Sequence, residues 1–530
     1  MTNFLDNLNL KKILFLGLFF RILATIFSKG YAFTDDQFEV VELAQTILDK
    51  GIANTFSSVP KGEAYLFNLI YVEIHTLIFG LCESLGWYNP EVKMLIARLV
   101  HALFSMLTIY VGYRLTERLS NRPNDAKIVG LLLAVFWVFP FMSVRNLREL
   151  ACTPPMMLGC YYACAKDIKT KQILLMAGWF TVSFILRYQI IFIPFVIGLW
   201  WLFNKQNWQK AITFGIAFGV VYMLTQGVFD TWAWGNPFAS IKTYANFNVK
   251  SENIAIYPNG PWHRYIGTVA GLFLGFPFLL LLAGYFVSAA PWLVSSPNTH
   301  ASAHTDVAFA SVVGEDTNHG AKNNRKMLFW ASMLFFAFHS YYPNKQERFI
   351  LPFLPFFITL GVIGFRDIYE QYFVKNWLRG FTKFAVIWFV ILNTILVFIL
   401  SVTYTKRPRV ESMNYLREKG DVQNFLIQNY EFAQLEAPFY LQKHYDYFMI
   451  DTHEKMAALP AELNSGKKTK PNYLILVGNT DLQKRIVEVK KVFPTMQHET
   501  DIEPSFIDNI AYLMNPSHNH NETFYIFKVK

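Results

Sequence analysis

The sequence predicts a polytopic, all-α membrane protein with about eleven transmembrane helices and a small C-terminal α/β domain outside the membrane. Three observations predict this fold class. Only 16% of the 530 residues are charged, whereas soluble domains carry about 25%. Hydrophobic residues make up 53% of the chain and aromatic residues 17%. Long apolar stretches recur up to residue 404, and residues 405–530 are mixed and charged. We therefore expect a transmembrane domain over residues 1–404 and an extramembrane domain over 405–530.

Twelve apolar stretches are the candidate spans, because a transmembrane helix needs roughly 20 apolar residues. The second stretch contains Glu73, His75 and Glu83, so we expect it to lie on the membrane surface. The other eleven are the expected spans. The stretches cover residues 12–29, 66–86, 92–113, 127–142, 149–165, 172–187, 188–203, 210–228, 265–290, 327–342, 349–364 and 381–404.

Basic residues predict the orientation, because short cytoplasmic loops of membrane proteins are enriched in Lys and Arg. If residues 66–86 do not cross the membrane, all the basic connections fall on the same side as the N-terminus. The 405–530 domain then lies outside, and the net charge of +10 reports orientation. It gives no indication of a nucleic-acid partner. The basic connections are residues 114–127, 166–171, 204–210, 322–326 and 366–383.

The outer connections hold most of the remaining charged residues. Two of them are long, residues 30–91 and 229–264, and charged groups near membrane depth are functional candidates. The long inner connection 291–326 is rich in Ala, Ser and Asn, so we expect it to be a flexible loop without a site.

The first candidate motif is Phe33–Val40, which follows the first span. Its adjacent carboxylates, Asp35 and Asp36, repel each other at a membrane surface. We expect such a pair of carboxylates to suit a general base or a cation ligand. The alternative is a structural role in which Thr34 or Asp35 caps the helix that follows.

The second motif, His339–Pro355, places Lys345 and Arg348 in a short outer connection. Such a pair can bind phosphate, the arginine as a fork and the lysine as a point charge. The alternative is that both side chains snorkel to the membrane interface.

The third motif, Val228–Gly267, is rich in Trp, Tyr, Gly and Asn. Aromatic faces and amide groups suit a sugar or a lipid headgroup, although an interfacial aromatic belt has a similar composition. The length and polarity of the segment favour a binding loop.

The C-terminal region has the patterns of a small α/β domain. Residues 473–478 and 524–530 predict strands, 437–451 predicts another pair of strands, and 480–492 has helical spacing. No glycine-rich phosphate loop follows a predicted strand, so a nucleotide site is not expected.

In this order the motifs resemble those of the GT-C glycosyltransferases of glycosyltransferase family 22. These are the mannosyltransferases of GPI-anchor and dolichol-linked oligosaccharide assembly. The first motif resembles the family's HPDE-x-F-Q and the second its HS-x-x-PHKE-x-RF. The third resembles a D-x-x-x-Y/W-G, NF-x-x-NV and PWHWY series, Leu186–Tyr188 resembles an LRP corner, and Ala437–Tyr440 resembles TPFYS. Phe33, Thr34, Asn344 and Gln346 depart from the pattern, so the resemblance is to a divergent member.

The resemblance implies inverting transfer of a sugar, expected to be mannose, from a polyprenyl-phosphate donor to a glycan or glycolipid acceptor. The reaction would take place at the outer face of a bacterial inner membrane, or in the lumen of the endoplasmic reticulum in a eukaryote. Asp35 would be the general base with Asp36 beside it, and neither a cofactor nor a metal is expected. Arg348, Lys345, His263 and Arg187 would bind the donor phosphate, and Asp230, Trp234, Asn246, Trp262, Arg264 and Glu347 the substrates.

Two other classes of protein share the membrane character. A transporter or flippase of lipid-linked sugars would also be polytopic, but transporters usually show internal repeats and polar residues within their spans. Here the polar residues cluster towards one face and no repeat is visible. A membrane scaffold that binds partners through residues 405–530 would leave the motifs unexplained.

Overall fold

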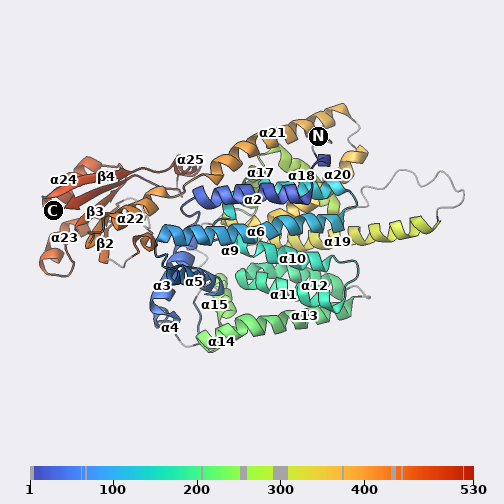
Figure 1. The fold of residues 1–530 in the computed structure, drawn as a ribbon, viewed down its shortest axis with the longest axis horizontal. Coiled ribbons are helices and arrows are strands. Elements are labelled where there is room, and N and C mark those ends of the chain that lie inside the picture. The colour runs from blue at the N-terminus through green and yellow to red at the C-terminus, as the bar shows by residue number, and fades with distance from the viewer. Residues whose placement is uncertain are drawn as a thin grey trace. The chain divides into compact units, whose positions relative to one another are not determined.

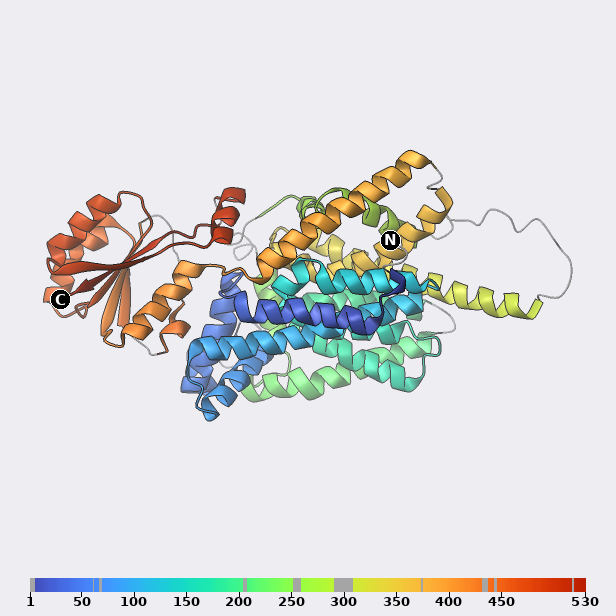
Figure 2. The same cartoon turned by 45° about the horizontal axis from the view of Figure 1, so that its top comes forward.

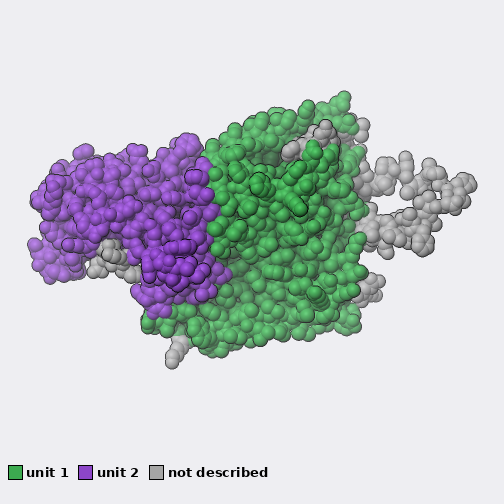
Figure 3. All heavy atoms as spheres, viewed as in Figure 1, with its two compact units in different colours: residues 1–24, 52–71, 99–401 green, residues 25–51, 72–98, 402–530 purple. Residues whose placement is uncertain are grey.

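A computed structural model gives the fold of the chain as two compact units, coloured separately in Figure 3. Unit 1 comprises residues 1–24, 52–71 and 99–401, and unit 2 comprises residues 25–51, 72–98 and 402–530. The structure describes residues 5–60, 62–65, 69–203, 207–250, 259–289, 308–372, 375–430, 437–442, 446–516 and 519–530.

Unit 1 is a helical bundle whose long helices run side by side in Figures 1 and 2. Helices are the expected form for apolar segments in lipid, because they satisfy every backbone polar group internally. The helices, including two that cross the unit boundary, are α2 (Leu10–Phe27), α4 (Ile52–Thr55), α6 (Pro90–Leu119), α7 (Pro123–Val135), α8 (Val138–Met142), α9 (Arg148–Ala151), α10 (Thr153–Ala163), α11 (Thr170–Leu186), η2 (Tyr188–Ile191), α12 (Phe192–Leu202), α13 (Trp208–Tyr222), η3 (Met223–Gly227), α14 (Val228–Trp234), α15 (Ala239–Val249), α17 (Arg264–Leu272), α18 (Phe276–Ala289), α19 (Ala308–Tyr341), η5 (Glu347–Phe353), α20 (Leu354–Tyr372) and α21 (Asn376–Ser401).

Several helices are long and apolar enough to cross a membrane. Among the described residues there are four such helices, or five if the bent pair α17 and α18 forms one span. Other predicted spans are divided; residues 127–142, for example, form α7 and α8. The multi-pass membrane character is thus supported, and the number of about eleven spans stays a prediction. The four helices are Pro90–Leu119, Trp208–Trp234, Glu347–Glu370 and Asn376–Ser401.

Helices α18 and α20 meet through glycines. A Cβ atom placed on Gly284 would lie 2.0 Å from the carbonyl oxygen of Gly361, and one on Gly364 would lie 2.0 Å from that of Gly284. The Ser288 hydroxyl also donates to the Leu360 carbonyl at 2.8 Å. Small residues allow helix backbones to approach closely in membrane proteins. This contact is therefore possible only because glycine has no side chain.

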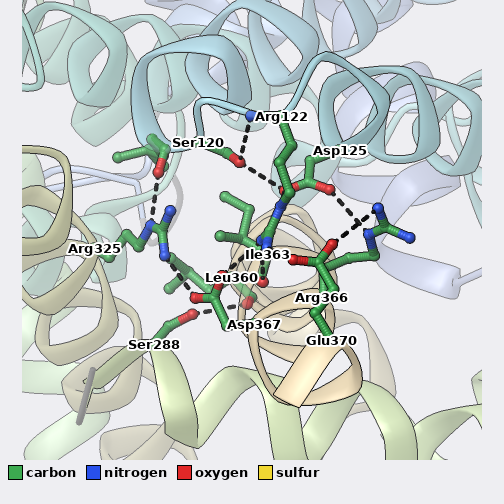
Figure 4. A network of polar contacts seen from close by, with 11 residues as sticks. Ser120, Arg122, Asp125, Ser288, Arg325, Leu360, Ile363, Arg366, Asp367 and Glu370 are labelled. Carbon is green, nitrogen blue, oxygen red and sulfur yellow. Dashed lines mark hydrogen bonds and ion pairs between the residues drawn. The ribbon is translucent and has the colours of Figure 1, made fainter. Parts of the chain in front are cut away.

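An ion-pair network connects three of the basic connections that the sequence assigns to the inner face (Figure 4). Asp367 accepts from Arg122 at 2.7 Å and from Arg325 at 2.8 Å. Asp125 is fully buried, and its carboxylate lies 3.0 Å from Arg122 and 3.5 Å from Arg366. The network joins the connection between α6 and α7 to α19 and α20.

Part of the predicted inner loop 291–326 is helical. Residues 291–307 lie outside the described residues, but α19 begins at Ala308, so the prediction of a loop is wrong for residues 308–326. A helix is costly to nucleate and cheap to extend, and the apolar segment that follows supplies the nucleus.

Unit 2 contains the C-terminal α/β domain together with the helices of the first long outer connection. Its sheet has the strand order β2-β1-β3-β5-β4, in which β2, β1 and β3 are parallel and β5 is antiparallel to both of its neighbours. The elements are η1 (Asp36–Glu42), α3 (Leu43–Lys50), α5 (Leu69–Ser84, which begins in unit 1), α22 (Arg407–Lys419), β1 (Asn424–Gln428), η6 (Pro438–Leu441), β2 (Asp446–Ile450), α23 (His453–Asn464), β3 (Tyr473–Val477), α24 (Leu482–Val492), β4 (Met496–Ile502), α25 (Phe506–Met514) and β5 (Phe524–Val529).

Both faces of the sheet are covered. Every residue of β1 and β3 is buried, as expected for strands with helices on each side, and helices flank the sheet in Figure 2. Met456 of α23 and Val489 of α24 pack with Leu426 and Leu474 on one face.

The strands predicted at 473–478 and 524–530 and the helix predicted at 480–492 are confirmed as β3, β5 and α24. The pair of strands predicted in 437–451 is half wrong. In the described part of this stretch only β2 is a strand, and Pro438–Leu441 forms the 3-10 helix η6, which suits the fixed φ of a proline at its start.

Candidate functional site

The second and third motifs lie against each other in unit 1. The Arg264 guanidinium donates to the Glu347 carboxylate at 2.5 Å, and the Tyr265 hydroxyl donates to the Gln346 carbonyl at 3.0 Å. The Gly260 N–H also donates to the Pro343 carbonyl at 3.2 Å. Segments about 80 residues apart in the chain therefore form one surface, and it includes two predicted substrate-binding residues, Arg264 and Glu347.

Beside this surface, two arginines share a buried carboxylate. Glu149 Oε1 lies 3.2 Å from Arg187 Nη2 and 3.5 Å from Arg348 Nε. The side chains of Glu149 and Arg348 are 3% and 7% exposed, and that of Arg187 is 12% exposed. Arg148 is close enough to Glu149 to interact with it electrostatically. We call Arg148, Arg187 and Arg348 around Glu149 the cation cluster.

Helix ends position the cation cluster. Arg187 follows the last residue of α11 in an extended conformation, with φ of −150°, and so turns the chain into η2. Glu149 lies on the single turn α9, and Arg348 lies on η5. The Arg187 guanidinium also lies 4.7 Å from the ring centroid of Phe349, a cation–π contact. Three arginines surround one carboxylate in a nearly dry place, so the cation cluster can compensate a further negative charge such as a phosphate.

Lys345 is buried but its ammonium caps a helix. Its Nζ donates to the carbonyls of His339 at 2.8 Å and Ser340 at 2.7 Å, and also to that of Tyr342. His339 and Ser340 lie in the last turn of α19, and Tyr342 directly follows the helix; carbonyls at a helix C-terminus lack helical partners and attract cations. The three bonds use all three N–H donors of an ammonium. Burial, and the positive charge of Arg264 to a smaller extent, lower the pKa of Lys345. In this structure Lys345 therefore contributes positive charge and orders the end of α19, and its N–H groups are already used in these hydrogen bonds.

Asp230, a predicted substrate-binding residue, is fully buried within the protein. Its carboxylate accepts from the Ser240 N–H at 2.9 Å, the Ser240 hydroxyl at 2.7 Å and the Gln226 amide at 2.6 Å. Because Asp230 lies in the first turn of α14 and Ser240 in the first turn of α15, these bonds tie the starts of the two helices together. Asp230 therefore orders the predicted binding loop from within the protein.

Trp234 is also buried, with its ring 5.5 Å from that of Phe56 in an edge-to-face contact. Asn246 is exposed on α15. Trp262 is 66% exposed, and its ring lies 5.5 Å from that of His263, which is exposed too. Asn246, Trp262 and His263 therefore present polar and aromatic surface, while Trp234 supports the loop.

Asp35 and Asp36 belong to unit 2, at the start of the π-helix η1. Asp35 stands at the N-cap position but makes no side-chain capping hydrogen bond, so the alternative capping role is wrong for this residue. Single π-turns within helices are frequent at functional sites. Among the described residues, the structure shows no group of His, Cys, Asp and Glu arranged to hold a metal ion.

Arg148 and Glu149 are among the charged residues near the outer face that the sequence makes functional candidates, but the sequence assigns them no specific role. The feature of the sequence that points to them is the stretch Arg145–Glu149, where three charged residues separate two apolar segments. The sequence shows this interruption, but it does not show that Arg187 and Arg348 share the carboxylate.

Comparison with known proteins agrees with this picture. The model of the Alg9-like mannosyltransferase family matches residues 12–431, and no curated protein matches the chain in sequence. Among solved structures, ArnT from Cupriavidus metallidurans bound to undecaprenyl phosphate superposes with a TM-score of 0.58 at 12% identity, over 97% of both chains. The oligosaccharyltransferase of Archaeoglobus fulgidus gives a TM-score of 0.44 at 11% identity, over 88% of this chain and 68% of the other. Both are proteins of the GT-C fold.

Proposed function

The chain belongs to the Alg9-like mannosyltransferase family, and from this membership we propose that it transfers mannose from a polyprenyl-phosphate donor. The acceptor is a glycan or glycolipid at the outer or lumenal face of the membrane. The membership and the GT-C fold make the chain a membrane glycosyltransferase. We propose, in addition, that the donor is a polyprenyl-phosphate sugar, that the acceptor is a glycan or glycolipid, and that transfer takes place at the outer or lumenal face.

The cation cluster is the observation that carries the proposal. When a sugar leaves a polyprenyl phosphate, negative charge grows on the phosphate oxygens, and donors already in position stabilise that charge most strongly in a dry site. Arg187 and Arg348 are buried or nearly so and are held by Glu149. ArnT from Cupriavidus metallidurans, which has the same fold, was solved with undecaprenyl phosphate bound, and a lipid carrier of this kind suits the cation cluster.

In the proposed reaction, Asp35 takes the proton of an acceptor hydroxyl while the oxygen attacks the anomeric carbon of the donor. The bond between that carbon and the phosphate oxygen breaks on the opposite side, so a single displacement inverts the configuration. The lipid phosphate leaves with the electron pair. Asp36 raises the local negative charge beside the base. Arg187 and Arg348 bind the departing phosphate, with Lys345 adding positive charge and His263 offering a hydrogen-bond donor.

The remaining predicted residues hold the two substrates in this proposal. Arg264 and Glu347, already paired at 2.5 Å, offer charged partners for sugar hydroxyls. Trp262 and Asn246 present an aromatic face and an amide. Asp230 and Trp234 order the loop that carries them.

The direct test uses Asp35→Asn in the full-length protein purified in detergent. We expect loss of transfer from polyprenyl-phosphate mannose by about 100- to 10,000-fold, the usual contribution of a general base, with donor binding unchanged. Asp451→Asn is the matched control, because Asp451 is an exposed acid that pairs with Lys455 in the C-terminal domain. Full activity of Asp35→Asn would overturn the assignment. Product mass distinguishes mannose from other sugars, and transfer itself distinguishes an enzyme from a transporter of lipid-linked sugars.

A further inference from the structure

Unit 2 contains a cavity of 140 Å³ that the proposed reaction does not use. Three separate parts of the chain line it: α3 with the end of η1, the end of α5 with the start of α6, and η6. The lining includes Glu42, Gln45, Glu83, Tyr88, Lys93 and Phe439.

The polar part of the lining is held together by a buried lysine. Lys93 is 3% exposed, and its ammonium donates to Glu83 Oε1 at 2.6 Å and to Gln45 Oε1 at 2.9 Å. The Gln45 amide N–H donors lie 2.9 Å from Asp49 Oδ1 and 3.1 Å from Glu83 Oε1. A buried lysine held by a carboxylate and an amide gives fixed donors and acceptors in a small space.

Another part of the lining is apolar and aromatic. The ring of Phe439 is buried and lies 5.2 Å from that of Phe79, which fixes its position. At the rim, Tyr88 is 54% exposed and Gln442 is exposed, so a ligand can enter from solvent. Phe439 belongs to the segment Ala437–Tyr440, whose resemblance to a family motif the reaction leaves unexplained.

Size and chemistry together select the ligand class. An engineered cavity of about 150 Å³ admits benzene, so 140 Å³ accommodates the ring atoms of one pyranose only if its exocyclic groups extend through the open side of the cavity, where Tyr88 and Gln442 are exposed. A sugar ring needs alternating donors and acceptors for its hydroxyls and an apolar surface for its C–H face. The charged groups of the lining are the carboxylates of Glu42, Asp49 and Glu83 and the ammonium of Lys93. This excess of negative charge disfavours anionic sugars.

We propose that this cavity binds an uncharged sugar residue of the acceptor glycan. The proposal rests on the proposed function, since it names where the acceptor of that reaction is recognised. The cavity lies in unit 2, the unit that also carries Asp35 and Asp36. Selectivity for the acceptor would therefore come from the first long outer segment and the C-terminal domain.

The test measures binding of methyl α-mannopyranoside to the full-length protein in detergent by saturation-transfer NMR. We expect saturable binding to the wild type. Gln45→Leu should weaken it about three- to tenfold, the effect of one or two lost hydrogen bonds. Tyr88→Ala, at an exposed rim position that tolerates truncation, should weaken binding as well. Gln497→Leu is the matched control, because Gln497 is exposed on β4, outside the cavity lining, and it should bind as the wild type does.

Two results would overturn the proposal: equal binding by wild type, Gln45→Leu and Tyr88→Ala, or tighter binding of methyl glucuronoside than of the mannoside. Transfer assays separate this proposal from the proposed function. If the wild type transfers mannose and Gln45→Leu raises the acceptor KM with the donor KM unchanged, both stand. If Gln45→Leu transfers mannose with an unchanged acceptor KM, the proposal for the cavity is refuted and the proposed reaction stands. If sugar binding depends on Gln45 but the protein never transfers mannose, the proposed reaction is refuted and the cavity still binds a sugar.

Discussion

Arg187 Nη2 lies 3.2 Å from Glu149 Oε1, so the corner after α11 is joined by charge to the single turn α9. Arg348 approaches the same oxygen at 3.5 Å. One carboxylate thus holds two arginines from distant parts of the chain in nearly dry surroundings. This arrangement keeps the cations in place before any phosphate arrives, and preorganisation of this kind is what electrostatic catalysis requires.

Replacement of Glu149 by Gln should destabilise the protein and make it depend on a phosphate ligand. Loss of one partner from a buried ion pair costs about 3–5 kcal/mol, because the other charge stays buried without compensation. A polyprenyl phosphate would supply the missing negative charge. We therefore expect a lower thermal midpoint for Glu149→Gln, and a larger rise of that midpoint than in the wild type when undecaprenyl phosphate is added. Equal rises in the two proteins would mean that the cation cluster does not bind the lipid phosphate.

Arg348→Ala should weaken donor binding at least about tenfold, since hydrogen bonds to charged groups contribute about 1.5–3 kcal/mol each. Arg348→Lys should recover only part of the affinity, because an ammonium cannot form a bidentate pair with a phosphate. Donor affinity can be measured with labelled polyprenyl-phosphate mannose. Arg114→Ala is the control, since Arg114 forms an exposed pair with Glu117 on α6. An unchanged affinity in Arg348→Ala would remove Arg348 from the phosphate site.

The sequence predicts those parts of the fold that depend on local pattern. Strands β3 and β5 and helix α24 follow from short-range periodicity. The family resemblance names Arg264 and Glu347 as substrate-binding residues, but only the structure shows that they form an ion pair. The helical start of α19 could not be predicted, because its polar residues are helical only through the segment that follows. Nor could the partner of Arg187, because Glu149 lies 38 positions away and only tertiary packing brings the two together. The role of Lys345 was similarly hidden, since its three acceptors are carbonyls, which every residue carries.

The contact between α18 and α20 should not tolerate a single added methyl group. In Gly284→Ala the new Cβ would lie 2.0 Å from a backbone carbonyl oxygen of α20, so the helices must separate. Overpacking usually costs about 1–3 kcal/mol, and a clash with backbone should reach the upper end. Gly267→Ala is the matched control on α17, because nothing lies within 4 Å of its Cβ position. Thermal unfolding in detergent should show a lower midpoint for the first variant only, and equal midpoints would contradict the close contact.

The network of Figure 4 should contribute to stability through its buried acid. Asp125 is fully buried, accepts from the Ser120 hydroxyl at 2.6 Å, and lies 3.0 Å from Arg122. Asp125→Asn keeps the shape but removes a carboxylate from Arg122 and Arg366, which are partly exposed, so we expect a loss of about 1–3 kcal/mol. Glu117→Gln, at an exposed pair on α6, should cost less than about 1 kcal/mol. Equal unfolding midpoints for the two variants would show that the network is not a stabilising contact.

The C-terminal domain should lose stability in acid. The hydrogen bond from Lys419 at 2.6 Å lowers the pKa of Glu499, which lies on β4. The hydrogen bond from Lys528 likewise lowers the pKa of Asp421. A carboxylate with a lowered pKa in the folded state contributes stability above its unfolded pKa, which is about 4.3 for Glu and about 3.9 for Asp. That contribution is lost as the pH falls through the folded pKa.

Hydrogen exchange of β4 and β5 in the full-length protein, at pH values from 6 down to 3, measures this loss where it is expected. After correction for intrinsic exchange rates, protection of the wild type should fall below about pH 4. Lys419→Met removes the cation that lowers the pKa of Glu499, so its protection should be smaller than that of the wild type at pH 6 and should change less with pH. The exposed pair Lys484 and Asp481 lies on α24, and Lys484→Met should therefore follow the wild type. If Lys419→Met and the wild type have parallel pH profiles, the pair with Glu499 does not contribute to the acid sensitivity of the sheet.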